Sequence, residues 1–136
     1  MKESKPFPLL VVVDLDYTLW PGFCEYYGPP HVQFNEHQVE CTLLASNTPI
    51  RFVLLSPFVF SLLQNKGSRL AIASRVHHER RAEALLGALG LLGFFAHREI
   101  HRGPKSIHLR RIAAVTGIAP QDMLFFDDQA DNGKHV

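Results

Sequence analysis

The sequence predicts a single three-layer α/β domain in which a doubly wound parallel sheet lies between helices. Three short segments are apolar at every position, namely Leu9–Val13, Leu70–Ala73 and Met123–Phe126. Such runs are typical of strands that are buried on both faces. Segments with helical spacing separate them, and this alternation indicates right-handed βαβ units. A length of 136 residues with 46% hydrophobic content fits one domain that spans residues 1–136.

Helices are predicted from their start signals and their periodicity. Ser56 and Pro57 resemble an N-cap followed by proline at the first helical position. Further along, His77–Leu89 and Lys105–Val115 carry apolar residues at helical spacing. Gly117 follows the last of these segments as a candidate C-cap.

The segment Pro21–Leu55 is longer than an ordinary connection between a strand and a helix. Weak alternation around Thr42–Leu55 predicts a short hairpin within it. We therefore expect an insertion or flap after the first strand, and no large or separate cap domain.

The C-terminal end also departs from the expected pattern. Only the polar stretch from Gln129 to the final Val136 follows Asp127 and Asp128. A doubly wound sheet usually continues with a further helix and strand, so a fragment, a truncated chain and a minimal variant are all compatible with this ending.

Composition excludes several classes of protein. The net charge of +1 provides no basic excess for tracking a phosphate backbone, so nucleic acid is not an expected partner. No apolar run approaches the ~18 residues of a membrane helix, and Leu9–Val13 is too short for a signal-peptide core. Two cysteines are too few for a disulfide framework. We expect a monomer in the cytoplasm.

Carboxylates follow the first and the last predicted strand. Asp14 and Asp16 come after Leu9–Val13, whereas Asp127 and Asp128 come after the final strand. Ligands of open α/β sheets bind beyond the carboxyl ends of the strands, so these four side chains converge if the strands are neighbours. Their mutual repulsion is relieved by a hard divalent cation, and Mg²⁺ prefers such oxygen ligands. Each aspartate alone is equally compatible with a turn or an N-cap, but two such pairs favour a metal site.

Further polar residues fit the same end of the sheet. Ser74 ends the second strand, where its hydroxyl could donate to a phosphate oxygen. Its neighbour Arg75 is interpreted as a substrate-binding residue, with pairing to an acidic surface as the alternative. Lys105 begins a helix, which is electrostatically unfavourable unless acidic groups face it.

Other residues are interpreted without a role in chemistry. The eight histidines are scattered along the chain and are interpreted as surface residues, while Cys24 and Cys41 are expected to be small apolar groups. Trp20 and Tyr17 are expected to pack near the site.

The order of these motifs resembles a known superfamily. Asp14-Leu-Asp-Tyr-Thr18 after an apolar strand, then Ser74, Lys105 and an Asp-Asp pair, is similar to the four-motif signature of haloacid dehalogenase (HAD) superfamily phosphatases. The stretches DLDYTLWP at 14–21, ASR at 73–75, HREI at 97–100 and FFDD at 125–128 resemble the magnesium-dependent phosphatase-1 family more closely. The resemblance extends from about residue 9 to residue 132.

The resemblance implies a role for each matching residue. Asp14 corresponds to the nucleophile that forms an aspartyl phosphate, and Asp16 to the general acid and base. Ser74 and Lys105 correspond to the groups that hold the transferring phosphoryl group. Mg²⁺ ligands are implied at Asp14, at Asp16 through its backbone carbonyl and at Asp128, with Asp127 beside them.

The function expected from this resemblance is hydrolysis of a phosphomonoester with Mg²⁺ as cofactor. The absence of a large cap leaves both small sugar phosphates and phosphotyrosine as substrates. Members of the superfamily continue with a further strand after the Asp-Asp motif. Its absence here makes a catalytically impaired phosphate- or partner-binding module the alternative. A receiver domain is a weaker third interpretation, because its acidic pair and its lysine should follow the opposite strands.

Overall fold

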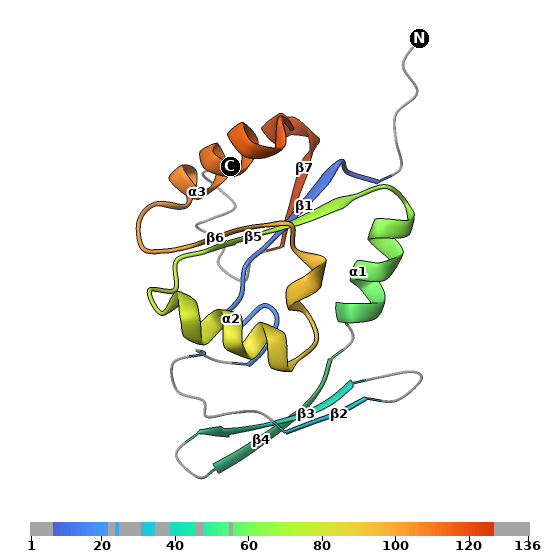
Figure 1. Cartoon of the computed structure of the whole chain (residues 1–136), viewed down its shortest axis with the longest axis vertical. Helices are drawn as coiled ribbons and strands as arrows, with labels where there is room; N and C mark the ends of the chain where they lie inside the picture. Colours follow the sequence, from blue (N-terminus) through green and yellow to red (C-terminus); the bar gives the residue numbers. More distant parts are fainter. Residues whose placement is uncertain are drawn as a thin grey trace.

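A parallel sheet with helices on both faces forms the body of the protein, and a smaller antiparallel sheet lies beside it (Figure 1). The computed structural model describes residues 7–21, 24, 31–34, 39–45, 48–54 and 56–126. The elements are β1 (Leu10–Val13), β2 (His31–Phe34), β3 (Val39–Ala45), β4 (Thr48–Leu54), α1 (Ser56–Asn65), β5 (Arg69–Ser74), α2 (Glu79–Ala88), η2 (Leu92–Phe94), β6 (His97–Ile100), α3 (Lys105–Thr116), η3 (Pro120–Asp122) and β7 (Met123–Phe126).

The parallel sheet confirms the predicted doubly wound α/β fold. Its strand order is β6-β5-β1-β7, with β1 between two parallel neighbours. Val13 is in register with Ile72 of β5 and with Phe126 of β7. The residues that follow these strands therefore meet at one end of the sheet.

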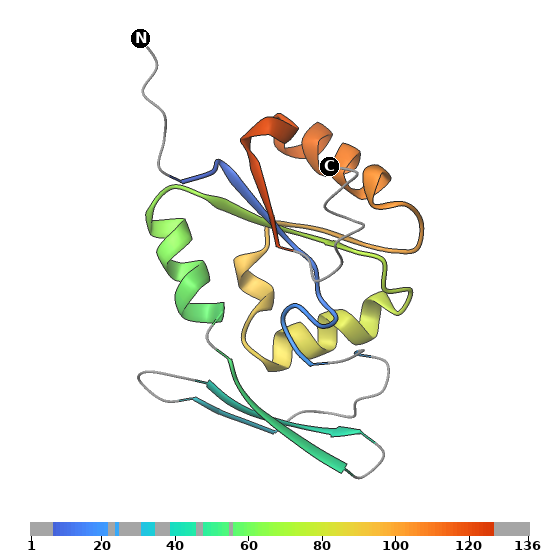
Figure 2. The same cartoon turned by 180° about the vertical axis from the view of Figure 1, so that it is seen from behind.

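Alternate residues of β1 face opposite helical layers. Val11 and Val13 belong to a core cluster that includes α1 and α2, whereas Leu10 and Val12 pack with residues of α3. Figure 2 shows α3 on the face of the sheet opposite to α1 and α2. Burial on both faces explains why every residue of this strand is apolar. In the described part of the chain, none of the helices is long and apolar enough to cross a bilayer.

Strand β7 lies at an edge of the parallel sheet as far as the described residues show, where it pairs with β1. Met123 and Phe125 pack against the α3 face, but Leu124 and Phe126 are each 43% exposed. Leu124 and Phe126 thus lie on the face of β7 opposite to α3, where the described residues leave them partly exposed.

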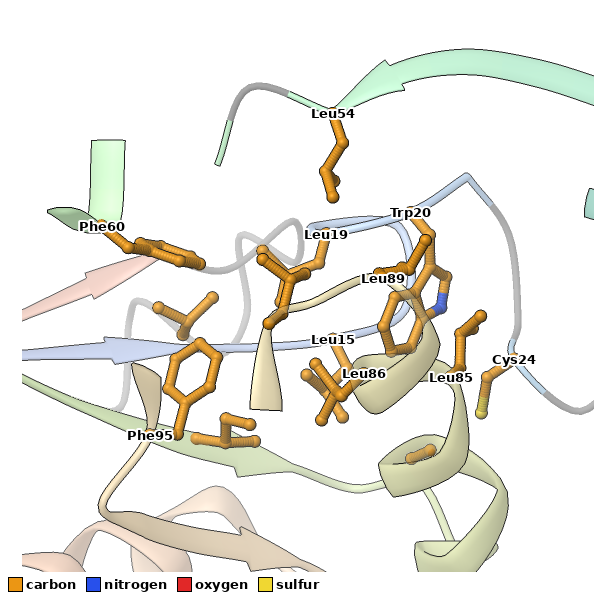
Figure 3. Close-up of a cluster of buried hydrophobic side chains, with 14 of the residues drawn as sticks. Leu15, Leu19, Trp20, Cys24, Leu54, Phe60, Leu85, Leu86, Leu89 and Phe95 are labelled. Carbon is orange, nitrogen blue, oxygen red and sulfur yellow. The ribbon is translucent and has the colours of Figure 1, made fainter. Parts of the chain in front are cut away.

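The insertion is more regular than the predicted short hairpin. Strands β3 and β4 form a long antiparallel hairpin, and β2 adds a third strand to it. Buried side chains of this sheet, among them Cys41, Leu43 and Leu54, join the same core cluster as Trp20 and Leu89. Figure 3 shows Leu54 on the side of this cluster where Trp20 and Leu89 lie. The insertion thus packs onto the parallel-sheet body through a shared apolar core.

One strand and one helix start differ from the sequence prediction, and a helix cap is confirmed. Strand β6 was not predicted, because Ile100 is its one buried residue and the others are polar. The second helix begins at Glu79 rather than at His77. The third helix ends at Thr116 and is followed by Gly117, whose left-handed φ of 70° confirms the C-cap prediction.

Candidate active site

Asp14 lies directly after β1, at the carboxyl end of the parallel sheet. Its backbone N–H donates to the carbonyl of Phe126 over 2.9 Å, which continues the pairing of β1 with β7. Its side-chain Oδ1 accepts a hydrogen bond from the N–H of Leu15 over 2.8 Å. The orientation of this carboxylate is therefore fixed by the backbone on both sides of it.

Lys105 brings a positive charge to Asp14 from the other end of the chain. Its Nζ lies 3.3 Å from Asp14 Oδ1, and the two side chains are 10% and 13% exposed. A lysine in the first turn of a helix opposes the helix dipole, so this carboxylate supplies the compensation that the sequence predicted. Limited access of water makes the pair stronger than an exposed ion pair.

Asp16 is oriented by two donors that the sequence did not identify. Its Oδ1 accepts from the indole Nε1–H of Trp20 over 2.8 Å and from the backbone N–H of Cys24 over 2.9 Å. Trp20 is 2% exposed, and Figure 3 shows its ring packed among Leu85, Leu89 and Cys24. Trp20 is thus a packing residue, as expected, and also a hydrogen-bond donor at the site. Only the polar edge of its ring could have suggested this second role.

A tight turn begins at Leu15, between the two aspartates. Leu15 is fully buried between them, and its carbonyl accepts from the N–H groups of Thr18 and Leu19 over 2.9 and 2.8 Å. Tyr17 takes a left-handed conformation with φ 62°, which is uncommon for a residue other than glycine. Its side chain is 55% exposed, on the loop that carries Asp14 and Asp16.

Ser74 and Arg75 end the strand next to β1. Ser74 is fully buried, and its Oγ accepts from the N–H of Val76 over 3.2 Å. Its carbonyl accepts from the N–H of His101 over 3.0 Å, where the backbone continues beyond β6. Arg75 is exposed. Ser74 therefore lies one strand away from Asp14, and the phosphate-binding roles of both residues stay predictions.

The second acidic pair, Asp127 and Asp128, lies outside the described residues. The described part of the chain contains no group of three His, Cys, Asp or Glu side chains suited to a metal. Asp14 and Asp16 nevertheless offer carboxylate oxygens on one loop, which is the donor chemistry that Mg²⁺ prefers. These two donors fit the ion, and ligation by Asp127 and Asp128 stays a prediction.

Glu99 forms a charged cluster near the N-terminus of α3. Its carboxylate oxygens lie 2.9 Å from His97 Nε2 and 3.0 Å from His101 Nε2, and Arg111 lies 3.6 Å away. Burial raises the pKa of the Glu99 carboxyl, but the hydrogen bonds and charges of His101 and His97 outweigh it and lower the pKa below 4.5. The ionised form is therefore favoured in the folded protein.

The variant Glu99→Gln should be less stable than the parent at neutral pH by about 1–2 kcal/mol, because an amide cannot accept charge-assisted bonds from both histidines. Because the pKa of Glu99 is lower in the folded than in the unfolded protein, its carboxylate stabilises the fold at pH values above the unfolded-state pKa. This stabilisation is lost as the pH falls through the folded-state pKa. Urea unfolding at several pH values should therefore show the difference shrinking below about 4.5. Glu79→Gln, at an exposed residue of α2, is the control. A difference that persists in acid would contradict the assignment.

Both cysteines are buried, as expected. Burial raises the pKa of the Cys41 thiol to about 11, so it stays protonated at neutral pH. A thiol nucleophile requires the thiolate, so Cys41 is not a candidate for catalysis.

Comparisons with known proteins agree with this geometry. The sequence model of a family described as acid phosphatase matches residues 6–136. A Homo sapiens protein named magnesium-dependent phosphatase 1 is 36% identical over 126 residues, which cover 92% of this chain and 70% of the human protein. A HAD-like hydrolase superfamily protein of Schizosaccharomyces pombe is 27% identical over 141 residues, which cover 97% of this chain and 82% of the yeast protein.

A solved structure is similar in fold. It is the N-terminal part of a Bacteroides fragilis protein that contains a phosphatase domain in complex with Mg, and it superposes with a TM-score of 0.70 at 21% identity. The match covers 96% of this chain and 33% of the bacterial one. At this level of identity the likeness concerns the fold.

Proposed function

The chain belongs to the acid phosphatase family, and we propose that it is a Mg²⁺-dependent phosphomonoester hydrolase acting through an aspartyl phosphate. The observation that carries the proposal is the buried pairing of Lys105 Nζ with Asp14 Oδ1 at 3.3 Å, beside a second oriented carboxylate on the same loop. In this proposal Asp14 is the nucleophile, Lys105 the stabilising cation and Asp16 the acid–base group.

Asp14 attacks the phosphorus atom of the ester. Its carboxylate is held by the Leu15 N–H, so it is positioned before the substrate arrives. A bond forms between Asp14 and phosphorus while the bond to the leaving oxygen breaks. The positive charge of Lys105 stabilises the equatorial phosphoryl oxygens during this transfer.

Asp16 gives a proton to the leaving oxygen and then removes one from water. Trp20 and the Cys24 N–H both donate to its Oδ1, so the proton in transit is carried on Oδ2. The water attacks phosphorus, the bond to Asp14 breaks, and inorganic phosphate leaves.

Mg²⁺ held by Asp14, by Asp16 and by the predicted ligand Asp128, with Asp127 nearby, would supply charge neutralisation at the transferring group. Ser74 and Arg75 are proposed to bind phosphate oxygens. The described insertion packs as a small sheet and no large cap was predicted. We therefore propose an open site that takes a small sugar phosphate or a phosphotyrosine side chain.

The test is hydrolysis of p-nitrophenyl phosphate by the purified chain with Mg²⁺, with EDTA, and with excess Mg²⁺ added after EDTA. We expect turnover that chelation abolishes and Mg²⁺ restores. A panel of hexose phosphates and a phosphotyrosine peptide then separates the two substrate classes by kcat/KM.

Each other outcome rejects part of the proposal. Turnover that is insensitive to EDTA would exclude a required metal. No turnover from a chain that unfolds cooperatively, and that still binds inorganic phosphate by calorimetry, would favour the binding-module alternative.

A further inference from the structure

His108 is a fully buried histidine on α3, three positions after Lys105. This position contradicts the interpretation of the histidines as surface residues. Its spacing to Ile112 and its adjacency to Leu109 place it on the buried face of the helix, which its helical period could have indicated. A buried titratable side chain needs partners for both of its ring nitrogens.

Both nitrogens of the His108 ring face backbone carbonyl oxygens. Nδ1 lies 3.1 Å from the carbonyl of Pro104, and Nε2 lies 2.8 Å from that of Ser74 and 2.7 Å from that of His101. A carbonyl oxygen can only accept, and a neutral imidazole carries a hydrogen on one nitrogen alone. A hydrogen on Nε2 can therefore donate to the carbonyls of both Ser74 and His101, while Nδ1 faces the carbonyl of Pro104.

The three carbonyls belong to three separate segments. Ser74 ends β5, His101 follows β6, and Pro104 is the N-cap of α3 directly before Lys105. One ring therefore joins the end of a central strand to the start of the helix that carries the lysine. The side chain of His108 itself has no exposed surface through which to contact a substrate.

The neighbours of this ring include the ring of a second histidine. The His101 ring stacks on it with centroids 3.9 Å apart, and His101 Nε2 lies 3.0 Å from Glu99. The other charged groups on the packed elements are His97 and Arg98 of β6, Arg69 of β5, Arg102 in the turn, and Lys105, Arg110 and Arg111 of α3, with Asp14 paired to Lys105.

We propose that His108, through its ring contacts with the carbonyls of Pro104, Ser74 and His101, is the positioning residue that fixes the N-terminus of α3 against the end of β5 and thereby sets Lys105 against Asp14. This inference rests on the proposed function for its catalytic consequence, but its structural part does not depend on turnover. A substitution at a remote residue that displaces a catalytic group by about 1 Å can lower the rate up to ~10²-fold. Loss of the His108 contacts should therefore have a measurable effect on turnover.

Two substitutions separate the contacts. The amide nitrogen of His108→Gln reaches the position of Nε2 and has two hydrogens for the carbonyls of Ser74 and His101. The amide of His108→Asn matches Nδ1 instead and reaches Pro104 alone. His108→Phe retains the ring volume without any donor.

The experiment combines nitrogen NMR of the ring with kinetics. We expect Nε2 of His108 to carry a hydrogen that is hydrogen-bonded to backbone carbonyls, whereas a ring without a hydrogen on Nε2 would overturn the proposal. The ¹⁵Nζ resonance of Lys105 should move in the Asn and Phe variants and stay close to the parent position in the Gln variant. Equal shifts in all variants, or none, would reject the positioning role.

The kinetic expectation follows the same order. Per folded molecule, kcat should fall about 10- to 100-fold in the Asn and Phe variants, with a smaller change in KM, and the Gln variant should recover most of it. A residue that only stabilises the fold would lower the midpoint of unfolding and leave kcat unchanged. If the parent chain has no turnover, the proposed function fails, and the two NMR readouts still decide on His108.

Discussion

The Asp14→Asn variant is expected to lose at least about 10³-fold in turnover of p-nitrophenyl phosphate, because an amide cannot serve as the attacking oxygen and carries no charge. The fold should persist, since Asn retains the oxygen that accepts from the Leu15 N–H. Acid quenching during turnover should trap a phosphoryl group on the parent chain, released by hydroxylamine, and none on the variant.

Matched variants sharpen this result. Asp122→Asn removes an exposed carboxylate from η3, at the opposite end of β7 from Asp14, and should behave as the parent. Asp16→Asn should still capture the phosphoryl group yet hydrolyse it slowly, so that labelled enzyme accumulates. Full activity in the Asp14 variant, or a label that persists in it, would reject the nucleophile.

The Lys105→Met variant should lower kcat/KM by about 10²- to 10³-fold, the usual cost of removing one preorganised group that stabilises transition-state charge. Methionine approximates the length of the aliphatic stem but cannot pair with Asp14 Oδ1 over the observed 3.3 Å. Lys105→Arg retains the charge with a broader, planar head group, and we expect an intermediate rate. Steady-state kinetics over a range of Mg²⁺ concentrations measures both effects.

The control for charge alone is Lys66→Met. Lys66 is exposed after α1, with its Nζ 5.9 Å from the centroid of the Phe7 ring. Lys66→Met changes the net charge by the same amount as Lys105→Met, and it should leave the rate unchanged. Parent-like activity of Lys105→Met, combined with normal unfolding, would show that the ion pair with Asp14 is structural.

The architecture could be predicted because buried parallel strands have a strong sequence signal. Leu10–Val13 and Met123–Phe126 are apolar at every position, and both were correctly identified as strands. Strand His97–Ile100 was not predicted. In the described part of the sheet it pairs with β5 alone, and Ile100 is its one buried residue, so it lacks an apolar run. The three-stranded insertion was underestimated because its alternation is irregular.

The candidate site was predictable where a residue type is unusual for its local position. Lys105 at a helix start and aspartates after a buried strand are such cases, and Lys105 and Asp14 do meet. The supporting groups were not predictable in this way. Trp20 contacts Asp16 through the polar edge of its ring, and His108 contacts the carbonyls of three segments through its two ring nitrogens. Apolar and helical spacing in the sequence does not indicate these contacts.

The pairing of β7 with β1 has a consequence for the timing of synthesis. Val13 emerges early from the ribosome, but its partner Phe126 lies more than a hundred residues later, and the carbonyl of Phe126 holds the Asp14 N–H. A contact between such distant segments carries a large loop-closure cost and forms late in folding. A nascent chain that stops short of β7 therefore has both aspartates but lacks one of the bonds that hold them. The bond between the Asp14 N–H and the Phe126 carbonyl can therefore form only after β7 has left the tunnel.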